Sequence, residues 1–99
     1  HSNNYLPKEF KLHQNYPNPF NPSTSIKYEL PFDGIVNVSI YDAKGKLVKT
    51  LLNENQTAGF KTFAWNSLDK NGNAVSAGLY FYKLTTNESQ QSMKMVLLK

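Results

Sequence analysis

Three prolines within six residues constrain this chain more than any other feature of its sequence. The stretch Asn15–Pro31 reads NYPNPFNPSTSIKYELP, with Pro17, Pro19 and Pro22 near its start. Proline holds its own φ at about −65° and keeps the preceding residue out of the helical region, so no helix can pass through here. Proline also lacks a backbone N–H, which excludes a central strand and favours an edge, a corner or a crossing between two sheets.

Two aromatic residues, Tyr16 and Phe20, stand among these prolines. A stiff backbone loses little further freedom when its side chains are buried, so we expect both rings to anchor the segment at the end of an apolar core. Two interpretations stay open for the segment as a whole. It is a rigid corner, or it is an extended recognition surface of the kind that partner grooves bind.

The length of the chain fits one domain. It has 99 residues, and a chain of this size buries roughly 60 to 70% of its unfolded surface. We expect a flexible lead-in over residues 1–9 and one folded domain over residues 10–99. Apolar residues make up 39% of the chain, too many for a disordered segment. No apolar run reaches the roughly 18 residues of a membrane span, so we expect no membrane insertion.

The charge pattern argues against nucleic acid as a partner. The net charge of +4 comes from eleven lysines and no arginine, spread from Lys8 to Lys99 rather than gathered in a run. Proteins that read nucleic acid usually place arginine forks against phosphates and guanines. Scattered lysines are typical of an ordinary solvated surface instead.

Alternation of apolar and polar residues predicts an all-β fold. Val36, Val38 and Ile40 form the clearest period of two in the chain. By the same pattern we expect strands near residues 10–13 and over 26–30, 36–41, 47–52, 60–65, 79–85 and 93–98. Turn signals separate these strands every eight to twelve residues or so. Six to eight short strands without a convincing helix predict an antiparallel β-sandwich.

Several polar segments are expected to be turns or loops. Asp42–Gly45 fits a tight hairpin connection, and Asn53–Gly59 is polar enough to be a loop. Asn71 and Gly72 are expected to supply the two left-handed residues of a type I′ turn. The segment 47–52 fits a helix almost as well as a strand, but its short length and the hairpin before it favour a strand.

The sequence offers little material for catalysis. His1 and His13 are the only histidines, and there is no cysteine. A catalytic pair would depend on His13 beside the proline-rich stretch, so we expect no catalytic residue and no enzyme. We also expect no cofactor and no metal site. Asp69, Asn71 and Asn73 have a spacing similar to that of calcium ligands, but turn chemistry explains the same residues.

A sugar-binding interpretation depends on the aromatic residues. Tyr41, Trp65, Tyr80, Phe81 and Tyr82 could form a platform for sugar rings, as in carbohydrate-binding β-sandwiches. Alternating aromatic residues in strands more often form the core and cross-strand pairs.

Four segments of the chain, taken in order, resemble a known family. They are QNYPNPFNPSTSIKYELP, VNVSIYDAKGKLVKTL, AGFKTFAWNSLDKNGNAVSAGLYFYKL and the closing MKMVLLK. Together they are similar to the type A C-terminal sorting domain of proteins exported by the type IX secretion system, from about Leu12 to Lys99. The resemblance implies an immunoglobulin-like antiparallel β-sandwich of about seven strands at the end of a larger cargo protein.

The same resemblance implies a function, a location and a set of partners. In a bacterium related to the Bacteroidota, the cargo would pass through the periplasm and be recognised by the outer-membrane translocon. In the family, a sortase-like peptidase can then remove the domain, leaving the cargo secreted or attached to the cell surface. The implied partners are the translocon, the peptidase and an upstream cargo domain in the same polypeptide. A dimer formed through sheet edges is also left open.

The resemblance marks particular positions of this chain. Its middle motif falls on Asp42, Gly45 and Val48. The partner-recognition residues that it implies are Tyr16, Pro17, Asn18, Pro19, Phe20, Asn21, Gly78, Tyr80, Lys94, Met95, Val96, Leu97, Leu98 and Lys99. We expect the terminal strand Met93–Lys99 to offer unpaired backbone groups to the partner by strand addition.

A second family is also similar. The Asp-Gly pair and the tryptophan followed by Gly-x-Tyr resemble the immunoglobulin-like domain of the flagellar hook-capping protein. The proline-rich opening favours the sorting domain over this relative. The alternative function is a carbohydrate-binding or structural β-sandwich module of a secreted enzyme.

Overall fold

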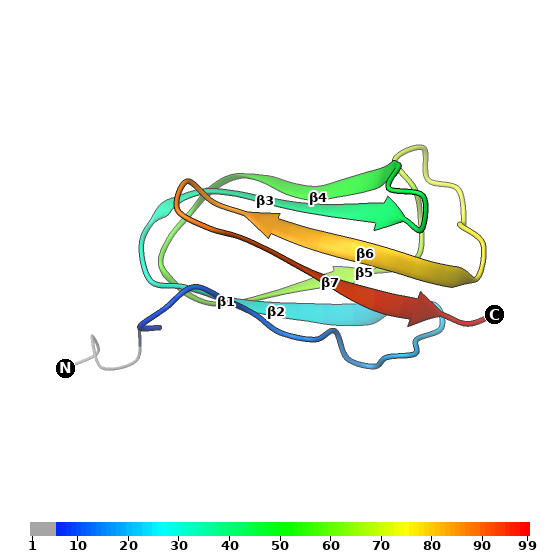
Figure 1. The fold of residues 1–99 in the computed structure, drawn as a ribbon, viewed down its shortest axis with the longest axis horizontal. Helices are drawn as coiled ribbons and strands as arrows, with labels where there is room; N and C mark the ends of the chain where they lie inside the picture. The colour runs from blue at the N-terminus through cyan, green and yellow to red at the C-terminus, as the bar shows by residue number, and fades with distance from the viewer. Residues whose placement is uncertain (1–5) are drawn as a thin grey trace.

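Over residues 6–99, which the computed structural model describes, seven strands form two antiparallel sheets that pack face to face (Figure 1). Across this part of the chain no helix is long and apolar enough to cross a membrane. The two packed sheets confirm the all-β sandwich predicted from alternation, and the segment 47–52 lies in a strand rather than a helix.

The first sheet has three strands and the second has four. The first contains β1 (Lys11–Leu12), β2 (Thr24–Leu30) and β5 (Gly59–Trp65), in the order β1-β2-β5. The second contains β3 (Gly34–Asp42), β4 (Leu47–Gln56), β6 (Gly78–Thr85) and β7 (Gln90–Leu97), in the order β4-β3-β6-β7. The strand β6, which has bulky residues on both faces, is central and lies between β3 and β7.

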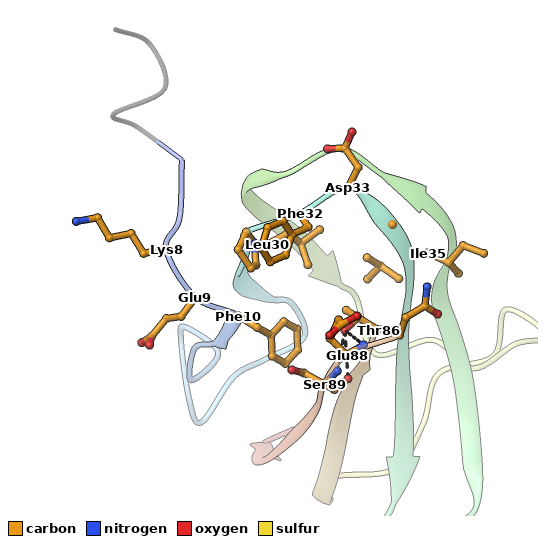
Figure 2. A pocket seen from close by; sticks show the side chains of 14 residues that line it. Lys8, Glu9, Phe10, Leu30, Phe32, Asp33, Ile35, Thr86, Glu88 and Ser89 are labelled. Carbon is orange, nitrogen blue, oxygen red and sulfur yellow. Dashed lines mark hydrogen bonds between the residues drawn. The ribbon is translucent and has the colours of Figure 1, made fainter.

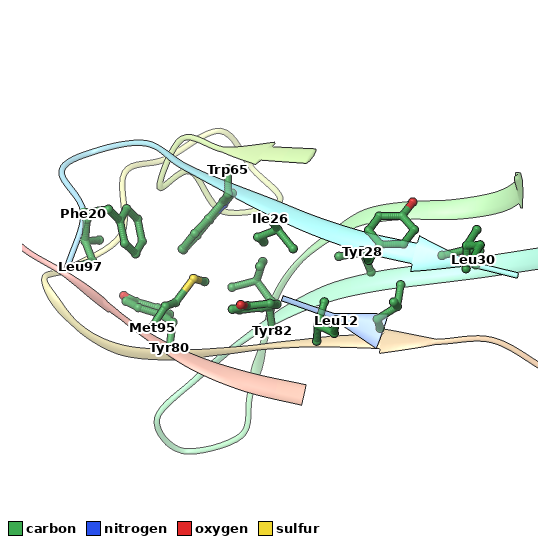
Figure 3. Packing of buried hydrophobic residues seen from close by; sticks show 14 residues of the cluster. Leu12, Phe20, Ile26, Tyr28, Leu30, Trp65, Tyr80, Tyr82, Met95 and Leu97 are labelled. Carbon is green, nitrogen blue, oxygen red and sulfur yellow. The ribbon is translucent and has the colours of Figure 1, made fainter. Parts of the chain in front are cut away.

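The core lies between the sheets and is filled by alternate residues of each strand. Ile26, Tyr28 and Leu30 of β2 face Tyr80 and Tyr82 of β6 across the sandwich (Figure 3). Complete burial of a Leu, Ile, Val, Phe or Met side chain stabilises a fold by about 1.5–3 kcal/mol. The buried apolar residues are Leu12, Phe20, Ile26, Tyr28, Leu30, Val36, Val38, Ile40, Trp65, Tyr80, Tyr82, Leu84, Met95 and Leu97.

The strands β4 and β7 extend well beyond one end of their predicted ranges. The expected loop Asn53–Gly59 is wrong for its first part, because β4 continues to Gln56 and pairs with β3 down to Gly34. In the same way, β7 begins at Gln90 rather than Met93 because it pairs with β6 up to Thr85. Polar residues continue both strands since a paired backbone, rather than an apolar side chain, holds them extended.

The turn expected at Asn71 and Gly72 has a different conformation. Only Gly72 has a positive φ, at 83°, so the turn is not type I′. The carboxylate of Asp69 accepts hydrogen bonds from the backbone N–H groups of Asn71 and Asn73, at 2.9 and 3.0 Å. An aspartate side chain therefore replaces part of the backbone pairing that a type I′ hairpin would have used.

Candidate recognition surface

The segment of residues 15–22 that holds the three prolines, here called the proline segment, lies beside the terminal strand β7. The two come from opposite ends of the chain. Phe20 forms a parallel bridge with Leu97. The N–H of Phe20 donates to the carbonyl of Val96 at 3.0 Å, and the N–H of Leu98 donates to the carbonyl of Phe20 at 2.8 Å. We call this junction of residues 14–20 with residues 94–98 the seam.

Two side chains extend the seam beyond Phe20. The amide oxygen of Asn18 accepts a hydrogen bond from the N–H of Val96 at 3.0 Å. The amide nitrogen of Gln14 donates to the carbonyl of Lys94 at 2.9 Å. The expectation of unpaired backbone along the terminal strand is therefore wrong at these positions, because the proline segment already occupies that edge of β7.

Buried hydrogen bonds hold the proline segment in place from behind. Asn15 is 2% exposed, and its amide nitrogen donates to the carbonyl of Pro17 at 3.1 Å and to the hydroxyl of Thr24 at 2.9 Å. The Thr24 hydroxyl in turn donates to the same carbonyl at 2.8 Å. Further along, the Ser67 hydroxyl donates to the carbonyl of Pro22. These bonds satisfy carbonyl groups that have no strand partner.

The two aromatic residues of the segment have opposite environments. Phe20 is 2% exposed, and its ring centroid lies 5.9 Å from that of Trp65 (Figure 3). Tyr16 is 80% exposed, so the expectation that it anchors the core is wrong. Its backbone is nevertheless fixed, since it exchanges two hydrogen bonds of 2.9 Å with Ser25. The Tyr16 ring is thus presented to solvent from a rigid base.

Gly78 and Tyr80 lie on the other side of β7 from the proline segment. Gly78 pairs with Leu97 and Tyr80 with Met95. The Tyr80 ring packs edge-on against Trp65 at 5.5 Å, and its hydroxyl donates to the carbonyl of Ser76 at 2.6 Å. Burial, and to a lesser extent the Asp42 carboxylate, raise the pKa of Tyr80. Tyr80 therefore supports the seam from inside rather than meeting a partner.

The predicted recognition residues thus gather at one end of the sandwich but divide by exposure. Four of them are buried and serve the core: Phe20, Tyr80, Met95 and Leu97. Nine are exposed: Tyr16, Pro17, Asn18, Pro19, Asn21, Lys94, Val96, Leu98 and Lys99. Gly78 is partly buried. Only the exposed set can contact a second molecule without unfolding.

Sequence reasoning missed four residues that build this surface. Gln14, Asn15, Thr24 and Ser67 all bond to the proline segment or across the seam. The one available signal was Asn15, an amide placed next to a proline-rich stretch that leaves carbonyls without partners. Nothing local marked the other three residues.

The residues of the middle motif lie in the β3–β4 hairpin, with Asp42 and Gly45 at its turn and Val48 in β4. The Asp42 carboxylate accepts from the N–H groups of Lys44 and Lys46, both at 2.9 Å. Gly45 has a φ of 85°, which glycine adopts without strain. The carbonyl of Val48 accepts a bond of 3.1 Å from the N–H of Lys70. The motif therefore folds the β3–β4 connection in the same way as Asp69 folds its own loop.

The aromatic platform for sugars is not formed as a group. Trp65, Tyr80 and Tyr82 are 1%, 6% and 0% exposed and face the core. Tyr41 and Phe81 are half-buried cross-strand neighbours on the other face of the sheet. Five rings on two faces cannot stack on one ligand.

The sequence also raised a metal site and a catalytic histidine as alternatives. Within residues 6–99 no group of three or more His, Cys, Asp or Glu side chains is placed to hold a metal ion. His13 Nε2 lies 2.6 Å from the Glu29 carboxylate, a contact that joins the residue after β1 to β2.

A hollow of about 420 Å³ lies between the β2–β3 turn and the β6–β7 turn (Figure 2). These turns are at the opposite end of the sandwich from the seam (Figure 1). Phe10, Leu30 and Phe32 form its apolar wall (Figure 2). Its polar side is the turn at Thr86 and Ser89, which hydrogen-bond to each other. None of the predicted recognition residues lines this hollow.

The comparisons place the chain among immunoglobulin-like domains. No curated protein matches the chain. PorU from Porphyromonas gingivalis is 24% identical, with a TM-score of 0.72 over 88% of this chain and 9% of PorU. PorZ from the same bacterium, an essential surface component of its type IX secretion system, is 19% identical, with a TM-score of 0.60 over 89% of this chain and 11% of PorZ. The chain thus spans about a tenth of either protein.

The flagellar protein FlgD provides the second likeness. FlgD from Xanthomonas campestris is 28% identical, with a TM-score of 0.60, over 92% of this chain and 63% of FlgD. The model of the FlgD Ig-like domain matches residues 22–90. This match covers more than half of the chain and includes β2 to β6. The chain therefore belongs to the family of FlgD Ig-like domains.

Proposed function

We propose that this domain is the C-terminal sorting signal of a larger cargo protein. It directs the cargo across the outer membrane by the type IX secretion system. The domain itself acts by binding rather than by catalysis. Its partners are the outer-membrane translocon, a sortase-like peptidase and the upstream cargo domain. The cargo passes through the periplasm and ends at the cell surface or in the medium.

One observation carries this proposal: the seam joins two segments that lie outside the family match. Residues 14–20 and 94–98 both fall outside the matched range 22–90. The structure brings them together through three backbone or side-chain bonds to Val96 and Leu98. The likeness in fold to PorZ, a component of a type IX secretion system, supports the same proposal.

The exposed part of the seam has the properties of a recognition surface. Tyr16 offers a large ring held on a fixed backbone, so a partner would lose little entropy in ordering it. Val96 and Leu98, 36% and 50% exposed, add apolar area on the neighbouring strand. At many interfaces, a few aromatic residues surrounded by apolar neighbours contribute most of the binding free energy.

The test joins the chain to a fluorescent protein with a periplasmic signal, in a bacterium with a type IX system. We expect fluorescence outside the cell that disappears when the translocon is disabled. Deletion of the last strand is a poor variant, because Met95 and Leu97 are 0% and 1% exposed and their loss would unfold the domain.

Surface variants with matched controls separate recognition from folding. Tyr16→Ala and Leu98→Ala change exposed seam residues, whereas Phe32→Ala and Ile35→Ala change residues of similar exposure near the opposite end. We expect the seam variants to reduce export about tenfold or more and the controls to export normally. Retention of the folded wild-type fusion in the periplasm would overturn the proposal.

A structural role in assembly is the second candidate. The observation that favours it is the 28% identity to FlgD of Xanthomonas campestris, whose structure concerns hook capping in flagellar assembly. A domain of this kind would hold its parent protein in an assembly without any export signal. The fusion experiment distinguishes the two, since an assembly domain would leave the fluorescent protein in the periplasm.

A further inference from the structure

The outermost strands on the two lateral sides of the sandwich differ in whether their outer edges are paired. On one side, the seam occupies the outer edge of β7 near its end. On the other side lie β4 and β5, the outermost strands of their sheets. Within residues 6–99 no strand pairs with the outer edge of β5. An unpaired edge is a ready template for another strand.

The backbone groups that face this free edge follow from the pairing of β2. Ser25 and Lys27 direct their hydrogen-bonding groups toward the β1 side, where they bond to Tyr16 and His13. Because such groups alternate along an antiparallel strand, the residues between them face β5. Their partners in β5 include Lys61 and Phe63. Phe60, Thr62 and Ala64 therefore direct their N–H and C=O groups away from the domain.

The side chains of these three residues are also exposed. Phe60 is 63% exposed, and Thr62 and Ala64 are exposed beside it. The strand pairs with β2 without any register shift, so its edge is regular. By contrast, the pairing of β4 with β3 shifts register between Val38 and Ser39 and again between Ile40 and Tyr41. A regular edge accepts a new strand more easily than a bulged one.

We propose that the β5 edge binds the β5 edge of a second copy of this chain, in an antiparallel pair centred on Thr62. This arrangement places Thr62 opposite Thr62 and Phe60 opposite Ala64, with all three outward residues paired. A large ring then lies beside a small methyl group on one face, and threonines pair at the centre. The two three-stranded sheets become one continuous sheet of six strands.

The inner face of the same pairing is complementary as well. It places Lys61 opposite Phe63, and both are partly buried in the single chain. A lysine stem and ammonium group packed on an aromatic ring interact favourably. Other registers pair fewer residues of the strand: a pair centred on Phe60 would leave Ala64 without a partner in β5.

The dimer should be weak and should respond to salt. A single strand pair buries less area than a standard stable interface of about 1,600 Å². Each chain also carries a net charge of +4, so the two copies repel at low ionic strength. We therefore expect association that strengthens with protein concentration and with added salt.

Sedimentation velocity of the purified chain from about 10 μM to about 1 mM tests the proposal. We expect the sedimentation coefficient to rise with concentration. Phe60→Lys should weaken association tenfold or more, since it sets a new positive charge at the pair. Asn55→Lys adds the same charge at an exposed position of β4 and is the matched control. A chain that stays monomeric throughout, or equal weakening by both variants, would overturn the proposal.

Cross-linking tests the register. The chain has no cysteine, so Thr62→Cys gives a protein with a single thiol. Directly opposed residues of a hydrogen-bonded pair have Cα atoms about 5.5 Å apart, within the range of a disulfide. Mild oxidation should give a disulfide dimer of Thr62→Cys several times faster than of Asn55→Cys. Equal rates for the two variants would exclude the Thr62-centred pair.

Discussion

The backbone N–H of Leu98 donates a hydrogen bond of 2.8 Å to the carbonyl oxygen of Phe20, although the two residues lie near opposite ends of the chain. This bond closes one side of the sandwich and fixes the proline segment against β7. It also separates two roles that lie side by side. The buried members of the seam hold the fold, and the exposed members are free to contact a partner.

Phe20 and Tyr16 should therefore respond in opposite ways to truncation. Phe20→Ala removes a ring that is 2% exposed and packs on Trp65, so we expect the free energy of unfolding to fall by about 3–5 kcal/mol. Tyr16→Ala removes a ring that is 80% exposed and should change it by less than about 0.5 kcal/mol. Urea unfolding followed by Trp65 fluorescence measures both. A large loss for Tyr16→Ala would show that its ring has a structural role.

The bond from Val96 to Asn18 should be measurable in hydrogen exchange. Asn18→Ala removes the acceptor at 3.0 Å, so the Val96 amide should exchange faster and the fold should lose about 1 kcal/mol. Asn21→Ala changes another exposed asparagine of the same segment and serves as the control. Unchanged protection of Val96 in Asn18→Ala would mean that this bond does not persist in solution.

The Asp69 loop offers a test of carboxylate capping. Asp69→Ala leaves the N–H groups of Asn71 and Asn73 without their acceptor, and we expect a loss of about 1–2 kcal/mol. Asp69→Asn keeps an oxygen at the same position and should recover much of that loss. Thermal unfolding of the three proteins gives the comparison. Equal destabilisation by both substitutions would assign the effect to the charge rather than to the hydrogen bonds.

Alkaline pH should destabilise the domain through two buried tyrosines. Burial raises the pKa of Tyr28 to about 12 and the pKa of Tyr82 to about 12, above the value of 10.0 for an exposed tyrosine. Between pH 10 and pH 12 the unfolded chain loses these protons first, so stability is complete below pH 10 and falls as the pH rises toward 12. Each tyrosine contributes a loss of about 2 kcal/mol across this window.

A phenylalanine variant isolates this effect. Tyr28→Phe removes one ionisable hydroxyl, together with its 3.1 Å bond to Gln56, so its stability should decline less between pH 10 and pH 12. Thermal unfolding at several pH values measures the slopes. Parallel curves for wild type and Tyr28→Phe would contradict the assignment to Tyr28.

The sequence predicted the local elements of this fold well. Val36, Val38 and Ile40 alternate, and all three are buried on one face of β3. The prolines excluded a helix, and the segment lies at the edge of the sheets, as their missing N–H groups require. These properties depend on residues close together in the chain, so a short stretch of sequence contains the information.

The tertiary structure decided which of these residues serve the core and which face solvent. Nothing local distinguishes Tyr16 from Phe20, since both are aromatic residues next to prolines. Their environments differ because Phe20 is held against Val96 and Leu98, whereas Tyr16 pairs with Ser25 and points outward. The length of β4 was likewise decided by its pairing with β3.

Restriction of φ and alternation act within a few residues, so the sequence alone indicated where most strands and turns lie and that the proline segment is rigid. The closing of the β7 edge by this segment, and the absence of any strand on the outer edge of β5 within residues 6–99, arise from the tertiary fold. Such choices depend on bonds between residues far apart in the chain. Their energy is set by the packing of the whole domain, which no single segment contains.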